Sequence, residues 1–206
     1  MWRATWWSIS CRHDGLDPGC EVETAGCPGP AQNGAMEHIA LVGAMGAGKT
    51  TIGREVARRL GRPFLDSDSA LEGRHGETAA DLATREGVGR LHDIELDIFD
   101  DLTDSAEASV IAPAASVIDS AEGRTILSRN LTIWLDAPEQ VLALRRDRSD
   151  HRRELQLEEL TELEERRRPF WESTAVVRIE NSGTVDDVVE GVLEAIRRIE
   201  ADQNSS

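Results

Sequence analysis

Residues 43–50, Gly43-Ala44-Met45-Gly46-Ala47-Gly48-Lys49-Thr50, decide the fold class of this chain. They match the pattern G-x-x-x-x-G-K-[ST], and they stand between a short apolar run at 39–42 and a helical pattern at 50–60. A strand, a glycine-rich loop and a helix in this order form the structural context that the pattern requires. The segment therefore predicts a phosphate-binding loop.

The residue types of this loop have a physical explanation. Glycines let the backbone wrap closely around phosphate oxygens, and successive N–H groups bind an anion at the start of a helix. Lys49 would place its charge on the β- and γ-phosphates, and the Thr50 hydroxyl would ligate Mg²⁺. Lys49 is the only lysine among 23 basic residues, and it occupies the position where the pattern needs one. The alternative is a glycine-rich turn with a solvated lysine.

Apolar runs and helical patterns alternate from Met36 onward. Strands are expected at 39–42, 63–66, 110–112, 131–135 and 175–179, and a last helix is expected from about Thr184 to Ile199. Strands separated by helices favour a parallel sheet covered on both faces. The predicted fold is a three-layer α/β/α domain around a central parallel five-stranded sheet, of the P-loop NTPase type.

The second expected strand ends in Asp66-Ser67-Asp68, which carries two carboxylates. Ligands of open α/β sheets bind beyond the carboxyl ends of the strands, so both side chains should face the phosphate loop. Alternation along a strand would send both to the same side. One could hold Mg²⁺ while the other orients and deprotonates a hydroxyl group. The alternative is a polar turn that caps the next helix.

Composition excludes several classes of protein. The formal net charge of −16 disfavours nucleic acids and anionic membranes as partners, and no apolar run is long enough to span a membrane. Residues 1–35 contain all three cysteines and show no periodic apolar pattern, so we expect a disordered extension ahead of a domain at 36–201, with a short tail at 202–206. The expected protein is a cytoplasmic monomer that acts on a small molecule.

From Met36 to the last helix the chain resembles the shikimate kinase family. The matching segments are Gly43–Thr51, Phe64–Asp68, Leu71–Gly76, Ala80-Asp81, Glu95 and Arg167–Trp171. The Asp-x-Asp with its following helix is more specific than the phosphate loop, which many families share. The resemblance implies transfer of the γ-phosphate of ATP to the 3-hydroxyl of shikimate, with Mg²⁺, on the route to aromatic amino acids.

The resemblance also implies residue roles. Lys49, Asp68 and Arg153 would be catalytic, with Arg152 a nearly equal alternative to Arg153. Thr50 and Asp66 would hold Mg²⁺, and a mobile lid would lie at about 147–157. The acceptor would be bound by Asp68, His92, Ala114 and Arg167. The ATP-binding residues would be Gly43, Gly46, Ala47, Gly48, Lys49, Thr50, Thr51, Arg146 and Arg153.

Three departures from the family pattern lie on the acceptor side or in the lid. His92 replaces an arginine that binds the substrate carboxylate, Pro113-Ala114-Ala115 replaces three glycines, and Arg153–Gln156 differs from the lid sequence Arg-Pro-Leu-Leu. Imidazole cannot form a two-pronged pair with a carboxylate, and Pro113 lacks an N–H group. Three hypotheses therefore stay open: a shikimate kinase, a kinase for another polyol or cyclitol, and a nucleotide-binding module without transfer activity.

Overall fold

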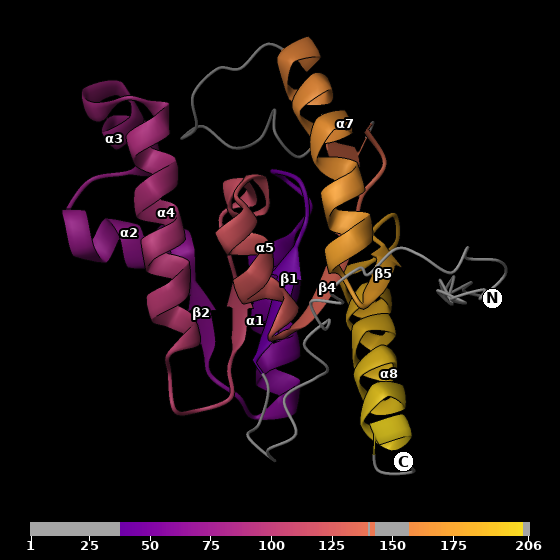
Figure 1. Ribbon diagram of the computed structural model, residues 1–206. Helices are drawn as coiled ribbons and strands as arrows, with labels where there is room; N and C mark the ends of the chain where they lie inside the picture. The colour runs from indigo at the N-terminus through magenta and orange to yellow at the C-terminus, as the bar shows by residue number, and fades with distance from the viewer. Residues whose placement is uncertain (1–37, 140, 143–156, 204–206) are drawn as a thin grey trace, which may run out of the picture.

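The computed structural model describes residues 38–139, 141–142 and 157–203 (Figure 1). The expected extension at 1–35, most of the expected lid, and two predicted site residues, Arg146 and Arg153, lie outside this part. The described strands are β1 (Ile39–Val42), β2 (Phe64–Asp66), β3 (Val110–Ala112), β4 (Leu131–Asp136) and β5 (Val177–Glu180). The helices are α1 (Lys49–Leu60), α2 (Ser67–His75), α3 (Ala79–Glu86), α4 (Val88–Thr103), the 3-10 helix η1 (Ala115–Asp119), α5 (Ala121–Ser128), α7 (Leu157–Thr174) and α8 (Val185–Gln203).

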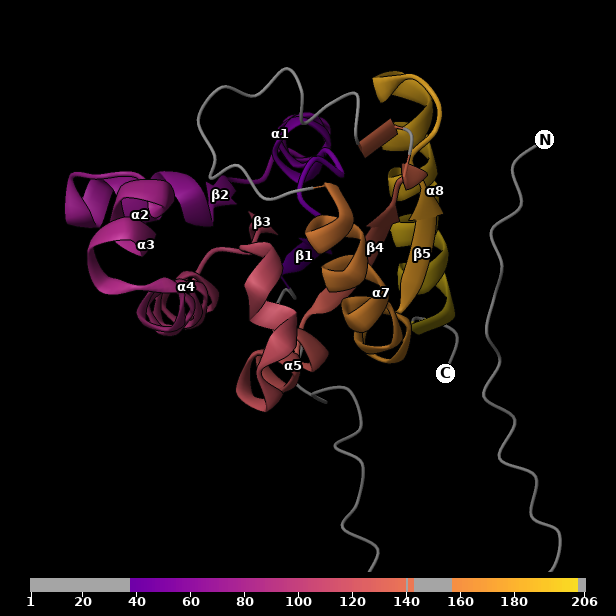
Figure 2. The same cartoon turned by 90° about the horizontal axis from the view of Figure 1, so that it is seen from above.

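The five strands form one parallel sheet in the order β2-β3-β1-β4-β5. In the view from above, α1 and α8 lie over one face of the sheet, and α5 and α7 lie over the other, while α2 and α3 lie beyond the β2 edge (Figure 2). This arrangement confirms the predicted three-layer α/β/α fold.

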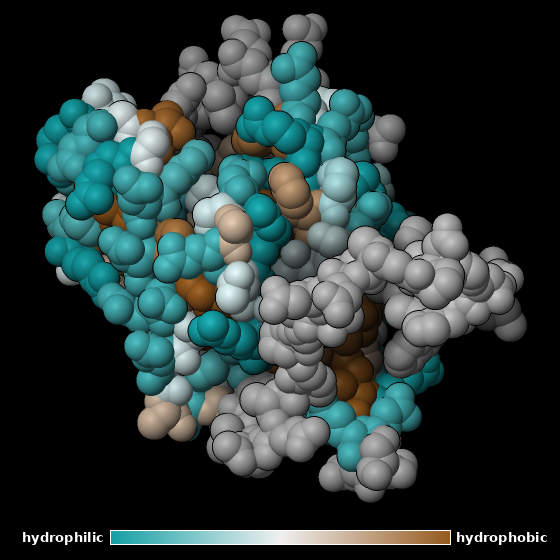
Figure 3. Space-filling model, in the orientation of Figure 1, coloured by the Kyte–Doolittle hydropathy of each residue, from teal (hydrophilic) through white to brown (hydrophobic). Residues whose placement is uncertain are grey.

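The core is built where the apolar runs were found in the sequence. β1, β3 and β4 are buried along their whole length, as expected for parallel strands covered by helices on both faces. Among the described residues the outer surface over α4 and α7 is mostly hydrophilic, with apolar residues scattered between polar ones (Figure 3). The exposed large apolar side chains are few: Val88, Val176 and Val185.

Two element boundaries differ from the sequence-based expectation. β5 begins at Val177 and not at Ala175, because the N–H of Ala175 donates to Trp171 O (2.9 Å) and so extends the last turn of α7. α8 continues to Gln203, past the expected end of the helix and into the expected tail.

α7 is fixed to the sheet by an aromatic and ionic cluster at the β4–β5 edge. The rings of Trp134 on β4 and Trp171 on α7 stack with centroids 5.9 Å apart. Arg168 pairs with Asp136 at 3.1 Å, and Arg178 pairs with the same carboxylate. These contacts define the position of the helix that carries Arg167.

Candidate active site

The phosphate loop joins β1 to α1 and depends on glycines at three positions. Gly43, Gly46 and Gly48 have φ values of 146°, 84° and 86°, which L side chains rarely adopt. A Cβ atom on Gly43 would also lie 2.5 Å from Leu135 O. Gly48 supplies no side-chain cap to α1, as expected where the start of a helix is to bind an anion. The loop therefore has the geometry that its sequence predicts.

Lys49 lies over this loop. Its Nζ donates to Gly43 O at 3.0 Å and to Ala44 O at 3.1 Å, both at the beginning of the loop. The ammonium group is therefore held on the side where phosphates would enter.

The carboxylate of Asp66 caps the helix α2 and also contacts Thr50, the other residue expected to hold Mg²⁺. Its Oδ1 accepts from the N–H groups of Asp68 (3.0 Å) and Ser69 (3.3 Å) and so caps α2, while its Oδ2 accepts from Thr50 Oγ1 at 2.7 Å. A hydroxyl and a carboxylate side by side are the oxygen ligands that Mg²⁺ prefers. Among the described residues no group of three or more His, Cys, Asp or Glu side chains could hold a metal. Any Mg²⁺ here would therefore depend on the nucleotide phosphates and water for its remaining ligands.

Asp68 lies in a helix, whereas the sequence predicted that it would lie in the strand. The expectation that it continues the strand is wrong, because β2 ends at Asp66 and Asp68 belongs to the first turn of α2. The cap at Asp66 starts this helix at Ser67. Asp68 nevertheless lines the same cavity as Asp66.

One cavity of about 620 Å³ brings most of the predicted site residues together. Those that line it are Gly46, Gly48, Lys49, Thr50, Thr51, Asp66, Asp68, His92, Ala114 and Arg167. Gly43 and Ala47 are buried outside its lining, where they shape the loop from behind. Pro113, Ala115 and Glu95 also line the cavity, so the altered loop after β3 does border the expected acceptor side.

Arg167 of α7 and His92 of α4 both line the cavity. Arg167 is buried and makes a two-pronged ion pair with Asp119, through Nε–Oδ1 at 2.9 Å and Nη2–Oδ2 at 2.6 Å. His92 is partly buried, and its pKa is lowered by this burial and by the positive charge of Arg167, while Asp119 opposes the shift. His92 is therefore mainly neutral at pH 7.

Sequence reasoning missed three residues around the cavity. Asn181, directly after β5, donates from Nδ2 to Ala47 O at 2.6 Å and so ties the sheet to the phosphate loop. Asp119 pairs with Arg167, and the Ser116 hydroxyl donates to the buried carboxylate of Glu95. The position of Asn181 after a strand was a usable signal. Nothing local in the sequence marks Asp119 or Ser116.

The fold and this cavity define a nucleotide-binding kinase of the P-loop class. The sequence model of the shikimate kinase family matches residues 45–197. Shikimate kinase of Symbiobacterium thermophilum is 37% identical over 168 residues, which cover 78% of this chain and 96% of the relative. The chain therefore belongs to the shikimate kinase family.

Solved structures agree with this assignment. Shikimate kinase from Acinetobacter baumannii in complex with shikimate superposes with a TM-score of 0.75 and 34% identity, covering 79% of this chain and 94% of that one. Shikimate kinase from Bacteroides thetaiotaomicron gives a TM-score of 0.72 and 26% identity, over 79% and 99% of the two chains. No helix in the described part of the chain has the length and apolar character needed to cross a membrane.

Proposed function

We propose that the protein transfers the γ-phosphate of ATP to the 3-hydroxyl of shikimate, with Mg²⁺ as cofactor. The observation that carries the proposal is the single cavity that joins the phosphate loop to Asp68 and Arg167. Binding both partners in one cavity aligns the hydroxyl with the phosphoryl group, and positioning provides much of the catalysis in phosphoryl transfer.

The nucleotide end would be formed by the loop and the start of α1. The N–H groups of the loop and the Lys49 ammonium would bind the phosphates, with Thr51 beside them at the rim. Thr50 and Asp66 would hold Mg²⁺, which when bound neutralises charge on the phosphates. Arg146 and Arg153, which lie outside the described residues, remain proposed ATP-binding groups, and Arg153 remains a proposed catalytic residue.

The acceptor end would be formed by Asp68, His92, Ala114 and Arg167. Asp68 would accept the proton of the attacking hydroxyl as the new O–P bond forms, and the bond from the γ-phosphorus to the bridging oxygen breaks to release ADP. Arg167 would pair with the acceptor carboxylate, for which a guanidinium is well shaped.

A second candidate is transfer to a polyol or cyclitol without a carboxylate. It is favoured by the neutral His92 in place of an arginine, and by Pro113 and Ala114 where glycines would leave more room. With fewer cations facing the acceptor, a carboxylate contributes less to binding.

A coupled assay of ADP release tests both candidates. The purified chain should turn over Mg-ATP with shikimate and not with uncharged cyclitols. The opposite preference would favour the second candidate, and ATP binding without transfer to any acceptor would favour a nucleotide-binding module.

We also propose a cytoplasmic monomer of which residues 36–201 form the kinase domain; size-exclusion chromatography with light scattering tests the oligomeric state.

A further inference from the structure

We propose that Asp119 is a positioning residue that orients Arg167 toward the carboxylate of the acceptor. This assignment rests on the proposed function, because it concerns the group that would recognise shikimate. Asp119 is the last residue of η1, and Arg167 lies near the middle of α7. The two are 48 positions apart in the sequence.

The geometry of the pair leaves one edge of the guanidinium for a second carboxylate. Asp119 approaches from the side of Nε and Nη2, at 2.9 and 2.6 Å. A guanidinium carries five N–H donors, and its other edge is formed by Nη1 and the second hydrogen of Nη2. Arg167 lines the cavity, whereas Asp119 lies outside its described lining. An acceptor carboxylate would therefore meet the edge opposite Asp119.

Burial makes this support necessary. The side chain of Arg167 is only 7% exposed, and a buried charge without a partner is unfavourable. An arginine that is already paired and fixed in one rotamer also loses little side-chain entropy when the acceptor binds. The pair therefore both permits the cation in the cavity and orients it in advance.

The short helix η1 that carries Asp119 is anchored to α4. The Ser116 hydroxyl on the same short helix donates to Glu95 of α4. η1 thus connects α4 to α7 across the acceptor side of the cavity, with one polar contact to each.

The helix α7 has anchors to the sheet besides the pair with Asp119. It is held by the stacking of Trp171 on Trp134 and by the ion pair between Arg168 and Asp136. Loss of Asp119 should therefore release the guanidinium of Arg167 without moving the helix, which separates positioning from general stability.

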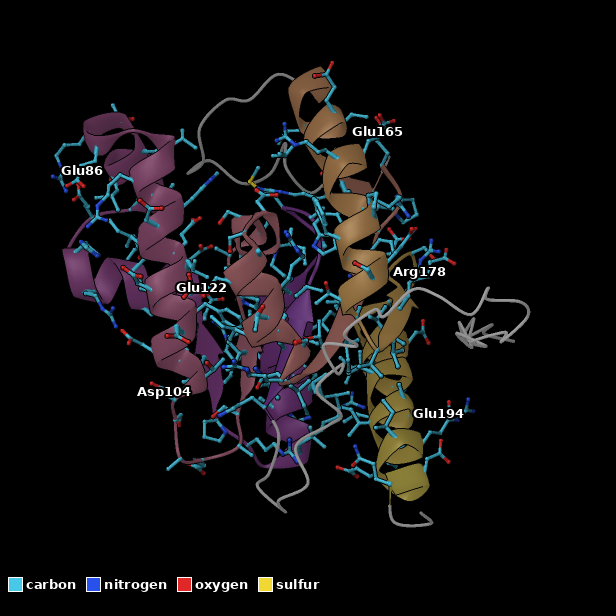
Figure 4. The ribbon with its side chains drawn as sticks, viewed as in Figure 1. Glu86, Asp104, Glu122, Glu165, Arg178 and Glu194 are labelled. Atoms are coloured by element: carbon cyan, nitrogen blue, oxygen red, sulfur yellow. The ribbon has the colours of Figure 1, made fainter. Side chains whose placement is uncertain are left out.

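The test is steady-state kinetics of Asp119→Asn and Asp119→Ala with shikimate and with its methyl ester. We expect the KM for shikimate to rise about tenfold or more, because one charged interaction with the carboxylate is lost. The KM for ATP should change less than twofold. The KM for the uncharged ester should be unchanged by either substitution. The matched control is Asp104→Asn, which should behave as wild type. Asp104 is an exposed aspartate at the C-terminal end of α4 (Figure 4).

Three outcomes would overturn the assignment. A KM for shikimate that stays constant or falls in Asp119→Asn would mean that Asp119 only screens the charge of Arg167. An equal rise for shikimate and for the ester would indicate general damage to the site. If Asp119→Ala does not fold, the near-isosteric Asp119→Asn carries the test. Absence of shikimate turnover by the wild type would instead refute the proposed function, and this assignment with it.

Discussion

Replacing His92 by arginine is the sharpest test of how this cavity recognises its acceptor. His92 lines the cavity on α4, and its neutral imidazole can offer one hydrogen bond to an acceptor carboxylate. Arginine would supply a permanent charge and two donors. Glu95, one turn later on the same helix and also facing the cavity, would offset the repulsion from Arg167.

The expected size of the effect follows from these contacts. A hydrogen bond to a charged group contributes about 1.5–3 kcal/mol, and a neutral His92 that binds the acceptor carboxylate would already provide part of this. We expect a net gain of about 1.4 kcal/mol, which lowers the KM for shikimate about tenfold in His92→Arg. The KM for ATP should stay constant, because the substitution leaves the phosphate loop and Lys49 unchanged.

The pH dependence provides a second measurement of the same interaction. Burial and Arg167 lower the pKa of His92 below its ordinary value of about 6.5, so the folded protein holds a neutral imidazole at pH 8 and gains the proton only below that value. The wild-type KM for shikimate should therefore fall only as the pH drops below about 6.5. His92→Arg should show no such fall.

The assay is coupled ADP release at pH 6 and pH 8. His75→Arg is the matched control. His75 is exposed in the last turn of α2, so this substitution adds the same charge outside the lining of the cavity. A KM for shikimate that does not fall in His92→Arg, or that falls equally in His75→Arg, would refute the reasoning.

Three further predictions concern the nucleotide end and the chain boundary. Lys49→Ala should abolish most of the rise in Tm that Mg-ATP produces in the wild type, because it removes the charge on the β- and γ-phosphates; an equal rise in both proteins would contradict the phosphate-loop assignment. Asn181→Asp should raise the KM for ATP about ten- to a hundredfold with an unchanged KM for shikimate, since a carboxylate would face the carbonyl of Ala47. Asn130→Asp is its control, because that buried amide bonds Ile126 O at 2.8 Å outside the lining of the cavity, and an equal KM effect there would argue against the role of Asn181. Deleting residues 1–35 should leave cooperative unfolding and ATP binding intact, as measured by thermal denaturation with and without Mg-ATP, and precipitation of the shortened chain would show that the extension belongs to the core.

Much of the nucleotide site could be predicted from the sequence, because the signals are local. The phosphate loop needs glycines with positive φ and a lysine at fixed spacing, and these are neighbours in the chain. The apolar runs at 39–42, 110–112 and 131–135 become buried parallel strands for the same reason, since burial on both faces requires unbroken apolar segments.

The acceptor side was decided by tertiary structure. Asp68 lies in the helix α2, which the Asp66 side chain caps. Strand alternation therefore predicted correctly that the two carboxylates share a cavity, but it predicted the wrong secondary structure for Asp68. The partners Asp119 and Arg167 are 48 positions apart, and Asn181 and Ala47 are 134 positions apart. Such pairs leave no periodic pattern, because only the packing of α7 on the sheet and the pairing of β4 with both β1 and β5 bring their polar groups within hydrogen-bonding distance. The sequence alone determined that a phosphate-loop pattern follows β1; only the folded chain determined which charged side chains line the cavity beside it.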